Sequence, residues 1–239
     1  MGSDRPRRPA QEPRLTEGRR RSELYGRRMG RPLSEHQAAL IETLLPRIAL
    51  PEGPLDPRRL FPGAREFAFE VGFGGGEHVA GQARAHPAWG FIACEPFVNG
   101  VGKLLAGIEI AGLSNIRVHM GDARNVLGRL PDRVLSAVYV LFPDPWPKLR
   151  HHKRRFVQRE TLDQISRVLK AGGEYRLATD HAGYAAWALQ HLMADFRFRW
   201  TASSAADWRE RPADWPPTRY EQKALKAGRA CTYLRFSRV

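Results

Sequence analysis

Residues 134–148 have the sequence VLSAVYVLFPDPWPK, an apolar run that passes directly into a loop with three prolines. The run from Val134 to Phe142 predicts a strand buried on both faces of a sheet. Proline cannot donate to a strand ladder and its ring fixes φ, so the strand should end at Pro143 in a stiff loop. We therefore expect Asp144 and Lys148 at the carboxyl end of a central strand, the edge where open α/β sheets bind ligands.

A strongly basic segment follows this loop. Residues 148–155 contain five Lys or Arg and two His, and no acidic residue occurs between Asp144 and Glu160. The first turn of a solvent-exposed helix normally favours acidic side chains, because they interact well with the helix N-terminus. A cluster of basic side chains at this position instead predicts a surface that binds an anionic polymer. The candidate contacts are Lys148, Arg150, His151, His152, Lys153, Arg154 and Arg155.

The whole chain is also basic, with a formal net charge of +14 over 239 residues, which again favours nucleic acid as a partner. No apolar run is long enough to cross a bilayer and no secretory segment follows Met1. Cys94 and Cys231 both fall in expected strands, where a small core residue is more usual than a disulfide. We expect a cytoplasmic protein, either a monomer or a homodimer.

Composition divides the chain into three parts. Residues 1–31 carry ten Arg and four acidic residues with few apolar side chains, which is typical of a disordered basic arm. Residues 32–63 begin with a capping-box pattern at Ser34, continue as an amphipathic helix and end in a Pro-rich stretch expected to be a linker. The main domain is predicted at 64–239.

From residue 66 to about residue 200, strand patterns alternate with helix patterns. The expected strands are Phe67–Val71, Trp89–Glu95, Ile116–Met120, Val134–Phe142 and Glu174–Thr179. The expected helices run to Ala85 and over Phe97–Ala111, Ala123–Leu130, Lys153–Lys170 and Ala182–Asp195. This alternation predicts an α/β fold with a doubly wound, mostly parallel sheet. Short strands near 196–200 and 231–236 would add an antiparallel edge hairpin, giving about seven strands.

A glycine loop, EVGFGGGE at residues 70–77, follows the first strand. Dinucleotide-binding loops need glycine at the first, third and sixth positions, and counting from Gly72 or from Gly74 puts Glu77 or Val79 at the sixth. Glu77 would also repel a diphosphate. The loop therefore argues against a nicotinamide cofactor, while Gly72, Gly74 and Gly76 remain candidates for close approach to another ligand.

Carboxylates at three successive strand ends indicate which ligand that is. Glu70 could face an ammonium group, Glu95 could hold the two hydroxyls of a ribose, and Asp122 with Ala123 could contact an adenine edge. A molecule with a cationic amino-acid end, a ribose and an adenine is S-adenosylmethionine. Each acid alone could be a helix N-cap, but all three together favour binding of this cofactor.

With these motifs in view, the chain resembles the bacterial tRNA (guanine-N(7)-)-methyltransferases over residues 25–236. The resemblance rests on the glycine loop, on Gly121-Asp122-Ala123, on the FPDPWPK block with its basic tail, on Thr179-Asp180-His181 and on Thr218-Arg219-Tyr220-Glu221. It implies a Rossmann-like class I methyltransferase that transfers a methyl group from S-adenosylmethionine to N7 of a guanosine, usually position 46 in the variable loop of tRNA.

The resemblance also implies residue roles. Glu70, Glu95, Asp122 and Asp144 match cofactor contacts, and Asp144 matches the catalytic residue. Substrate or RNA contacts are implied for Lys148, for the segment Arg150–Arg155, and for Asp180, Thr218, Arg219, Tyr220 and Glu221. We expect no metal site, because His151 and His152 have no third ligand at a useful spacing.

N7 of guanine carries no proton, so this transfer needs no general base and depends on positioning and electrostatics. We expect Asp144, Asp180 or Glu221 to accept hydrogen bonds from the guanine edge, and Trp146 or Tyr220 to stack on the base or pack the loop. Two alternatives remain: a class I methyltransferase acting on another nucleic-acid or protein nitrogen, and an RNA-binding subunit without activity.

Overall fold

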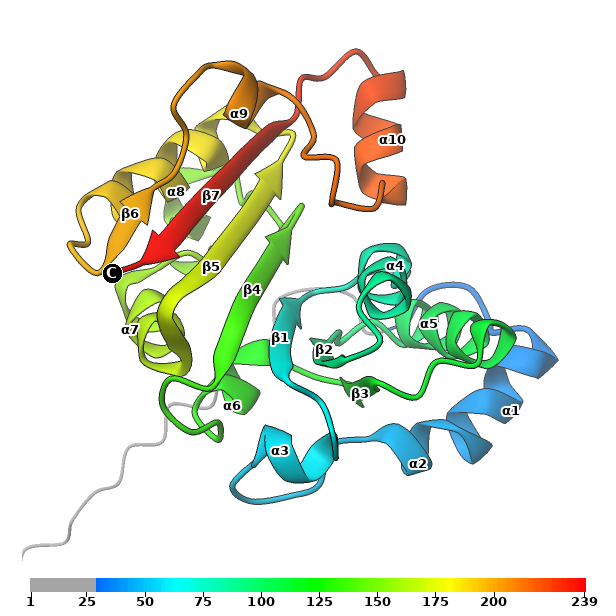
Figure 1. Cartoon of the computed structure of the whole chain (residues 1–239). Helices are drawn as coiled ribbons and strands as arrows, with labels where there is room; N and C mark the ends of the chain where they lie inside the picture. The colour runs from blue at the N-terminus through cyan, green and yellow to red at the C-terminus, as the bar shows by residue number, and fades with distance from the viewer. Residues whose placement is uncertain (1–28) are drawn as a thin grey trace, which may run out of the picture.

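The strand predicted from the apolar run lies at the centre of a sheet. In the computed structural model, which describes residues 29–239, β4 (Leu135–Leu141) is the middle of seven strands in the order β3-β2-β1-β4-β5-β7-β6 (Figure 1). Every residue of β4 is buried, as its unbroken apolar sequence predicts. The other strands are β1 (Glu66–Val71), β2 (Trp89–Cys94), β3 (Ile116–His119), β5 (Leu169–Thr179), β6 (Phe198–Trp200) and β7 (Thr232–Arg238).

The sheet is parallel from β3 to β5 and antiparallel at one edge. β1 pairs in parallel with both β2 and β4, and β4 pairs in parallel with β5. β7 runs antiparallel to β5 on one side and to β6 on the other. The predicted α/β class, the count of about seven strands and the antiparallel edge hairpin are therefore confirmed for the described residues.

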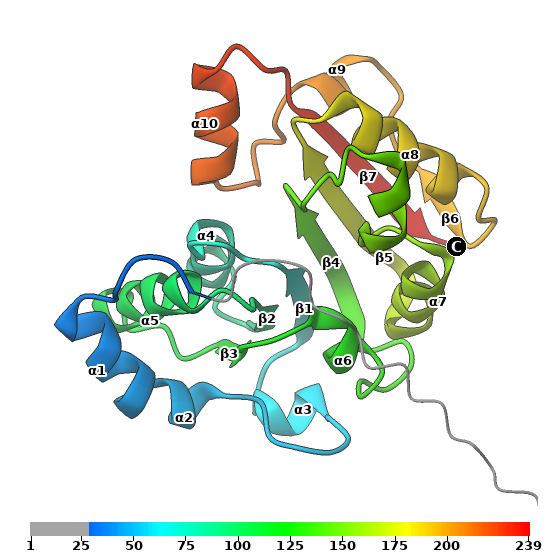
Figure 2. The same cartoon turned by 180° about the vertical axis from the view of Figure 1, so that it is seen from behind.

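Helices cover both faces of the sheet (Figure 2). Two core clusters divide at the sheet because neighbouring side chains of a strand point to opposite faces, so Phe67 and Phe69 join one cluster and Ala68 the other. The first cluster includes α6 (Ala123–Leu127), α7 (Arg159–Val168) and α8 (Ala182–Met193). The second includes α1 (Glu35–Thr43), α4 (Glu77–Ala85), α5 (Val98–Ala111) and α10 (Arg219–Lys226).

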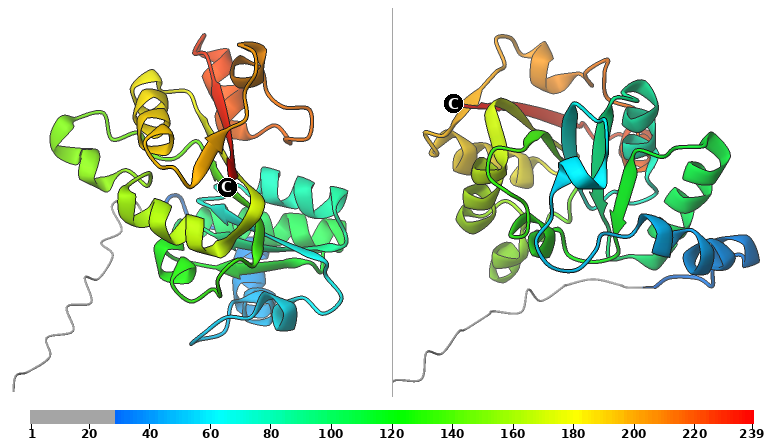
Figure 3. Two further views of the ribbon diagram at one scale, coloured as in Figure 1. Left: turned by 60° about the vertical axis from the view of Figure 1, so that its left-hand side comes forward. Right: turned by 60° about the horizontal axis from the view of Figure 1, so that its bottom comes forward.

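The segment before β1 is packed on the domain. Ser34 caps α1 by accepting a hydrogen bond from the amide of Gln37, and α2 (Leu45–Ile48) follows with Pro46 in its first turn. The chain then continues to Ala49, which bridges to Val118 of β3. The right-hand view of Figure 3 shows this blue segment at the edge of the molecule.

The Pro-rich stretch 50–63, which was expected to be a linker, lies between α2 and β1 and is packed on the domain. It contains α3 (Pro57–Leu60), and Leu55 and Phe61 are buried in the core because their apolar side chains cover the first cluster. The disordered arm predicted at 1–31 lies almost wholly outside the described residues.

One predicted helix is wrong. The helix expected over 153–170 is divided into a 3₁₀ helix, η1 (Leu149–Arg154), and α7, which begins only at Arg159. A capping box of Gln158 and Thr161 sets this start, because each side chain satisfies a backbone group that the helix end leaves unpaired. Gly172 and Gly173 lie inside β5, which begins at Leu169 opposite Leu135.

The last helices lie at the end of the sheet toward which β1 and β4 point. α9 (Ala206–Arg209) and α10 connect β6 to β7, and α10 stands beyond the carboxyl ends of β1 and β4 (Figure 1). Between residues 29 and 239, no helix combines the length and the apolar character that a membrane crossing requires.

Candidate functional site

The candidate site lies where β1 and β4 end side by side. After β1 the chain crosses to α4 on one face of the sheet, whereas after β4 it leads to η1 and α7 on the other face. This divergence opens a crevice at the carboxyl edge, which is where open α/β sheets bind ligands. Two adjoining cavities occupy it, and their shared walls are Gly72, Pro96, Pro143 and Asp144.

The first cavity, here called the glycine-loop cavity, has a volume of about 380 Å³. Gly72, Gly74 and Glu95 line it, as the sequence predicted for a ligand-binding loop. Helix α5 contributes Asn99, Gly100 and Lys103, and α10 contributes Arg219 and Tyr220. Tyr220 lies directly on the loop, because a β-carbon built on Gly74 would be 2.8 Å from its ring. Helix α10 and the glycine loop therefore line the same cavity.

Glu95 is the anchor of this cavity. Its Oε2 accepts a hydrogen bond of 2.7 Å from the amide of Gly74, and its Oε1 accepts one of 2.9 Å from the amide of Phe97. Burial raises the pKa of the Glu95 carboxyl above its usual value, while these two backbone amides act in the opposite direction. Each oxygen keeps a second lone pair, so the carboxylate can still accept hydroxyl groups of a ligand.

Glycine is required in the loop and in the neighbouring helix α5 for two different reasons. Gly72, Gly74 and Gly76 have φ of 66°, 59° and 82°, a left-handed region that other residues rarely adopt. Gly100 in α5 has ordinary helical geometry, but a β-carbon there would overlap the carbonyl oxygen of Gly74. The loop is therefore held against α5 by a contact that only glycine permits.

This contact gives a first prediction. We expect Gly100→Ala to push the loop away from α5, to destabilise the protein by about 1–3 kcal/mol and to weaken ligand binding in the cavity. Gly107→Ala is the matched control, since nothing lies within 4 Å of a β-carbon at this position of the same helix. It should stabilise by about 0.5–1 kcal/mol through helix propensity. Urea unfolding of both variants measures the difference, and equal stabilities would contradict the predicted overlap.

Glu70 lies below the loop and not in either cavity wall. It is buried, 3% exposed, and its Oε2 contacts Nδ1 of His78 at 2.7 Å. The sequence predicted that Glu70 would face an ammonium group; in this structure its contact is a histidine of α4 that the sequence motifs did not indicate. The signal was present, because His78 lies in the first turn of the helix that follows the loop.

The second cavity, here called the Asp122 cavity, has a volume of about 160 Å³ and mostly apolar walls. Asp122 and Ala123 form one side of it and Trp146 belongs to the same lining. Asp122 caps α6 by accepting the amide of Arg124, and the Arg124 guanidinium pairs with the same carboxylate at 2.7–3.0 Å. The carboxylate is therefore held in place beside a cavity with mostly apolar walls.

Asp144 stands between the two cavities on the loop that follows β4. Neighbouring atoms shield its carboxyl group partly from water, and this partial desolvation raises the pKa of Asp144 above its ordinary value of 3.8. Phe142 and Trp146 on either side of the loop have φ of 50° and 43°, a strained conformation for residues other than glycine. The loop therefore adopts an unfavourable backbone conformation that fixes the position of Asp144.

The basic segment after this loop divides into two groups. Lys148, Arg150 and Lys153 are exposed. Arg154 lies over the ring of Trp146, with 5.0 Å from its Cζ to the ring centre. His151 contacts the ring of Trp146 and His152 the ring of Trp187.

Arg155 is different. It is buried, 3% exposed, between the rings of Tyr184 and Trp187, and its Nε donates 2.9 Å to the carbonyl of Pro145. The structure therefore places Arg155 behind the loop as a support and not on the surface predicted to bind a polymer.

The predicted motif at 218–221 builds the start of α10. Thr218 and Glu221 form a capping box, a signature that T-x-x-E carries in sequence. Glu221 is 3% exposed and also accepts a hydrogen bond from the hydroxyl of Tyr233. Its Oε1 forms an ion pair with Nε of Arg211 at 3.1 Å. Asp180 pairs with Arg229 at 2.8 Å. Of this set, the cavity itself is lined by Arg219 and Tyr220.

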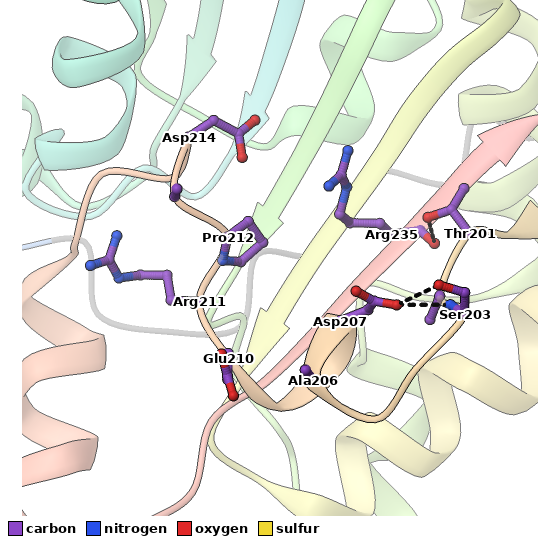
Figure 4. Close-up of a pocket in the computed structure, with 11 residues that line it drawn as sticks. Thr201, Ser203, Ala206, Asp207, Glu210, Arg211, Pro212, Asp214 and Arg235 are labelled. Carbon is purple, nitrogen blue, oxygen red and sulfur yellow. Dashed lines mark hydrogen bonds between the residues drawn. The ribbon is translucent and has the colours of Figure 1, made fainter.

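A further cavity of about 450 Å³ lies elsewhere, in the segment between β6 and α10 (Figure 4). Its polar walls include Asp207, which accepts hydrogen bonds from the amide and hydroxyl of Ser203 at 2.8 and 3.1 Å. It shares no lining residue with the two cavities at the crevice. Asp207 is thus engaged in shaping its own loop.

Comparison with known proteins identifies a family and relatives to which this chain is similar. Residues 64–234 match a protein family described as "Putative methyltransferase". A protein of Rhodospirillum rubrum named tRNA (guanine-N(7)-)-methyltransferase is 52% identical over 90% of this chain and 87% of that protein. A protein of the same name from Zymomonas mobilis is 47% identical over 90% of this chain and 94% of that protein.

Solved structures agree at the level of the fold. The crystal structure of the 16S rRNA methyltransferase KamB superposes with a TM-score of 0.58 at 17% identity, covering 78% of this chain and 95% of that one. An rRNA methylase from Streptococcus thermophilus superposes with a TM-score of 0.51 at 13% identity, covering 77% and 92%. The arrangement of sheet and helices is therefore that of a methyltransferase domain.

Proposed function

Because the chain belongs to the tRNA (guanine-N(7)-)-methyltransferase family, we propose that it methylates N7 of a guanosine in the variable loop of tRNA, at position 46. The family carries the reaction class: the protein is a methyltransferase with S-adenosylmethionine as methyl donor and tRNA as acceptor. The site within tRNA, the roles of individual residues and the mechanism are our proposal.

For each part of the cofactor we assign the residues that would hold it. Glu95 would hold the ribose hydroxyls with its two oxygens, and the Asp122 cavity, with Ala123 in its wall, would hold the adenine. Glu70, which is buried at the end of β1, would interact with the ammonium group. The observation that carries this arrangement is the position of Asp144, which is common to the walls of both cavities. The methyl group of a cofactor that spans the two cavities would lie beside this carboxylate.

Three carboxylates were candidates for the guanine edge, and their surroundings separate them. Asp180 is paired with Arg229, and Glu221 is buried with three partners that hold α10. Asp144 is exposed and faces the cavities. We therefore assign the hydrogen bonds from guanine N1–H and the exocyclic amine to Asp144, and a structural role to Glu221.

The chemistry follows from the acceptor atom. N7 has an in-plane lone pair and no proton, so it attacks the methyl carbon in line, the carbon–sulfur bond breaks, and no general base takes part. Positive charge moves from the sulfonium to the purine. A carboxylate beside the purine stabilises that charge as it forms, in a site where partial exclusion of water strengthens the interaction.

The exposed cations of η1 serve tRNA binding, and their removal should change its salt dependence. We expect Arg150→Ala combined with Lys153→Ala to weaken tRNA binding and to reduce the slope of log K against log salt by about 0.7–0.9 for each phosphate that the protein no longer neutralises. Arg58→Ala with Arg59→Ala removes two charges from α3, at the opposite end of the sheet, and should leave the slope unchanged. Equal slopes for both double variants would contradict an RNA contact at η1.

The proposed function is tested by methyl transfer from labelled S-adenosylmethionine to unmodified tRNA, followed by mapping of the modified base. N7-methylguanosine in the variable loop is the expected product. A methyl group on another atom or in another loop would overturn the proposed site while leaving the cofactor in place. The basic residues at 1–31 add positive charge that favours the same partner, and we propose a cytoplasmic location, where tRNA is modified.

A further inference from the structure

A buried polar chain connects the glycine-loop strand with the segment that leads to α10. Nδ1 of His78 contacts Oε2 of Glu70 at 2.7 Å, and Nε2 of His78 lies 3.4 Å from Nε2 of Gln82. The same Gln82 nitrogen donates 2.6 Å to the carbonyl oxygen of Asp214. Glu70, His78 and Gln82 are all at most 3% exposed. The chain therefore runs through the protein interior from β1 to residue 214.

The hydrogen-bond directions in this chain are determined by its two ends. The carbonyl of Asp214 only accepts, so the Gln82 atom facing it must be the NH₂ group. The second hydrogen of that group is then available to Nε2 of His78, which accepts it. Nδ1 of His78 consequently carries the proton and donates it to the Glu70 carboxylate. One tautomer of a neutral imidazole satisfies every member of the chain.

Packing fixes the chain on both sides. The ring of His78 lies 4.7 Å from that of Tyr139 and 6.5 Å from that of Trp215, edge to face in both cases. Trp215 is buried, 2% exposed. One turn further along α4, a β-carbon on Gly81 would lie 2.6 Å from the ring of Pro216. Residues 214–216 are thus seated directly on α4.

Residues 214–216 are followed directly by the start of helix α10. Thr218 begins α10 two residues after Pro216, and Tyr220 lies on Gly74 of the glycine loop. The side chain of Asp214 is held separately by Arg176 at 2.6 Å, so Gln82 holds the backbone and Arg176 the carboxylate. Figure 4 shows Asp214 and Arg211 on this connecting segment.

We propose that His78 and Gln82 are positioning residues for the methyl transfer. His78 orients the carboxylate of Glu70 toward the cofactor's ammonium group, and Gln82 ties the segment that leads to α10 to the same helix. Neither residue contacts substrate. Together they set the distance between the cofactor below the glycine loop and the guanosine held under Tyr220. This inference rests on the proposed function and adds to it residues that act through others.

Two substitutions test the two parts of this polar hydrogen-bond chain separately. His78→Gln places an amide near the former Nε2 and keeps the contact with Gln82, while it removes the donor to Glu70. We expect it to weaken binding of S-adenosylhomocysteine, measured by calorimetry, about tenfold, as for loss of a hydrogen bond to a charged group. Gln82→Met keeps the shape and removes both donors. We expect it to raise the KM for tRNA about five- to tenfold while cofactor affinity stays within about twofold.

His78→Asn is the conservative control. Its amide nitrogen stands close to the position of Nδ1 and can still donate to Glu70, so cofactor affinity should recover most of what His78→Gln loses. A purely structural role would give another pattern: melting temperature and the fraction of active enzyme would fall in all three variants, and neither cofactor affinity nor the KM for tRNA would move. That result would overturn the proposal. If the histidine variants do not fold, Gln82→Met still decides the role of Gln82 through the KM for tRNA.

The calorimetric arm does not depend on the tRNA site. If the wild-type protein failed to methylate N7, the proposed function would fail, whereas a tenfold loss of S-adenosylhomocysteine binding in His78→Gln would still support the role of His78. Unchanged binding in His78→Gln, with normal N7 methylation by the wild-type protein, would refute the positioning role and leave the function standing.

Discussion

Asp144→Asn is expected to lower kcat by about 10²-fold or more, with a much smaller effect on binding of S-adenosylhomocysteine. The side chain keeps its size and its place between the two cavities, so the decrease measures the effect of charge. An amide still accepts one hydrogen bond from the guanine edge but cannot balance the positive charge that forms on the purine. Single-turnover methyl transfer to tRNA at saturating concentrations of both substrates isolates this step.

The pH dependence of kcat is a second test of the Asp144 carboxyl group. Because desolvation raises the pKa of Asp144, the wild-type kcat should fall as pH drops through that raised value, which lies above 3.8. The asparagine variant has no carboxyl group there and should lack this part of the acid limb. Asp132→Asn is the matched control, because Asp132 is exposed and forms a surface pair with Arg167. Turnover of Asp144→Asn close to wild type would refute the electrostatic role.

Glu95→Gln is expected to weaken cofactor binding about 100-fold, since it removes charge-assisted hydrogen bonds and leaves a mismatched donor. Both oxygens of Glu95 already accept backbone amides, from Gly74 and from Phe97. In glutamine one oxygen becomes an NH₂ group that faces an N–H donor, so the glycine loop loses an anchor while the ribose loses an acceptor.

Calorimetry with S-adenosylhomocysteine measures this effect. Glu109→Gln is the control on α5: Glu109 is half exposed and pairs with His36 at 2.7 Å, far less constrained than Glu95. It should bind the cofactor product as the wild type does. If both variants bound equally well, Glu95 would not be a ribose ligand.

The fold was predictable because the pattern is long and regular. The apolar run at 134–142 and four other strand patterns, separated by helix-length segments, leave few topologies for a doubly wound sheet. The helix expected at 153–170 failed for a local reason. Its apolar spacing suits a helix, but Gln158 and Thr161 satisfy each other's backbone groups and start α7 there. Arg155 is drawn inward by aromatic rings that come from α8, far along the chain.

The candidate site was predictable in part. Strand ends of a parallel sheet meet at one edge, so carboxylates placed there by sequence meet as well, and Glu95, Asp122 and Asp144 do lie at the crevice. Helix α5 also contributes Asn99 and Lys103, which could not be identified from the sequence because their helix shows no motif.

The sequence by itself determined the sheet, the edge at which ligands bind and the residue types available there, because these depend on periodicity and on short-range backbone chemistry. Only the tertiary structure decided which of those residues remain open to a ligand. Glu221 is held by its own helix cap and by Tyr233, and Arg155 by the rings behind the loop, while Asp144 stays exposed. Such choices depend on how the elements pack against one another, and burial sets whether a charged group serves the fold or the substrate.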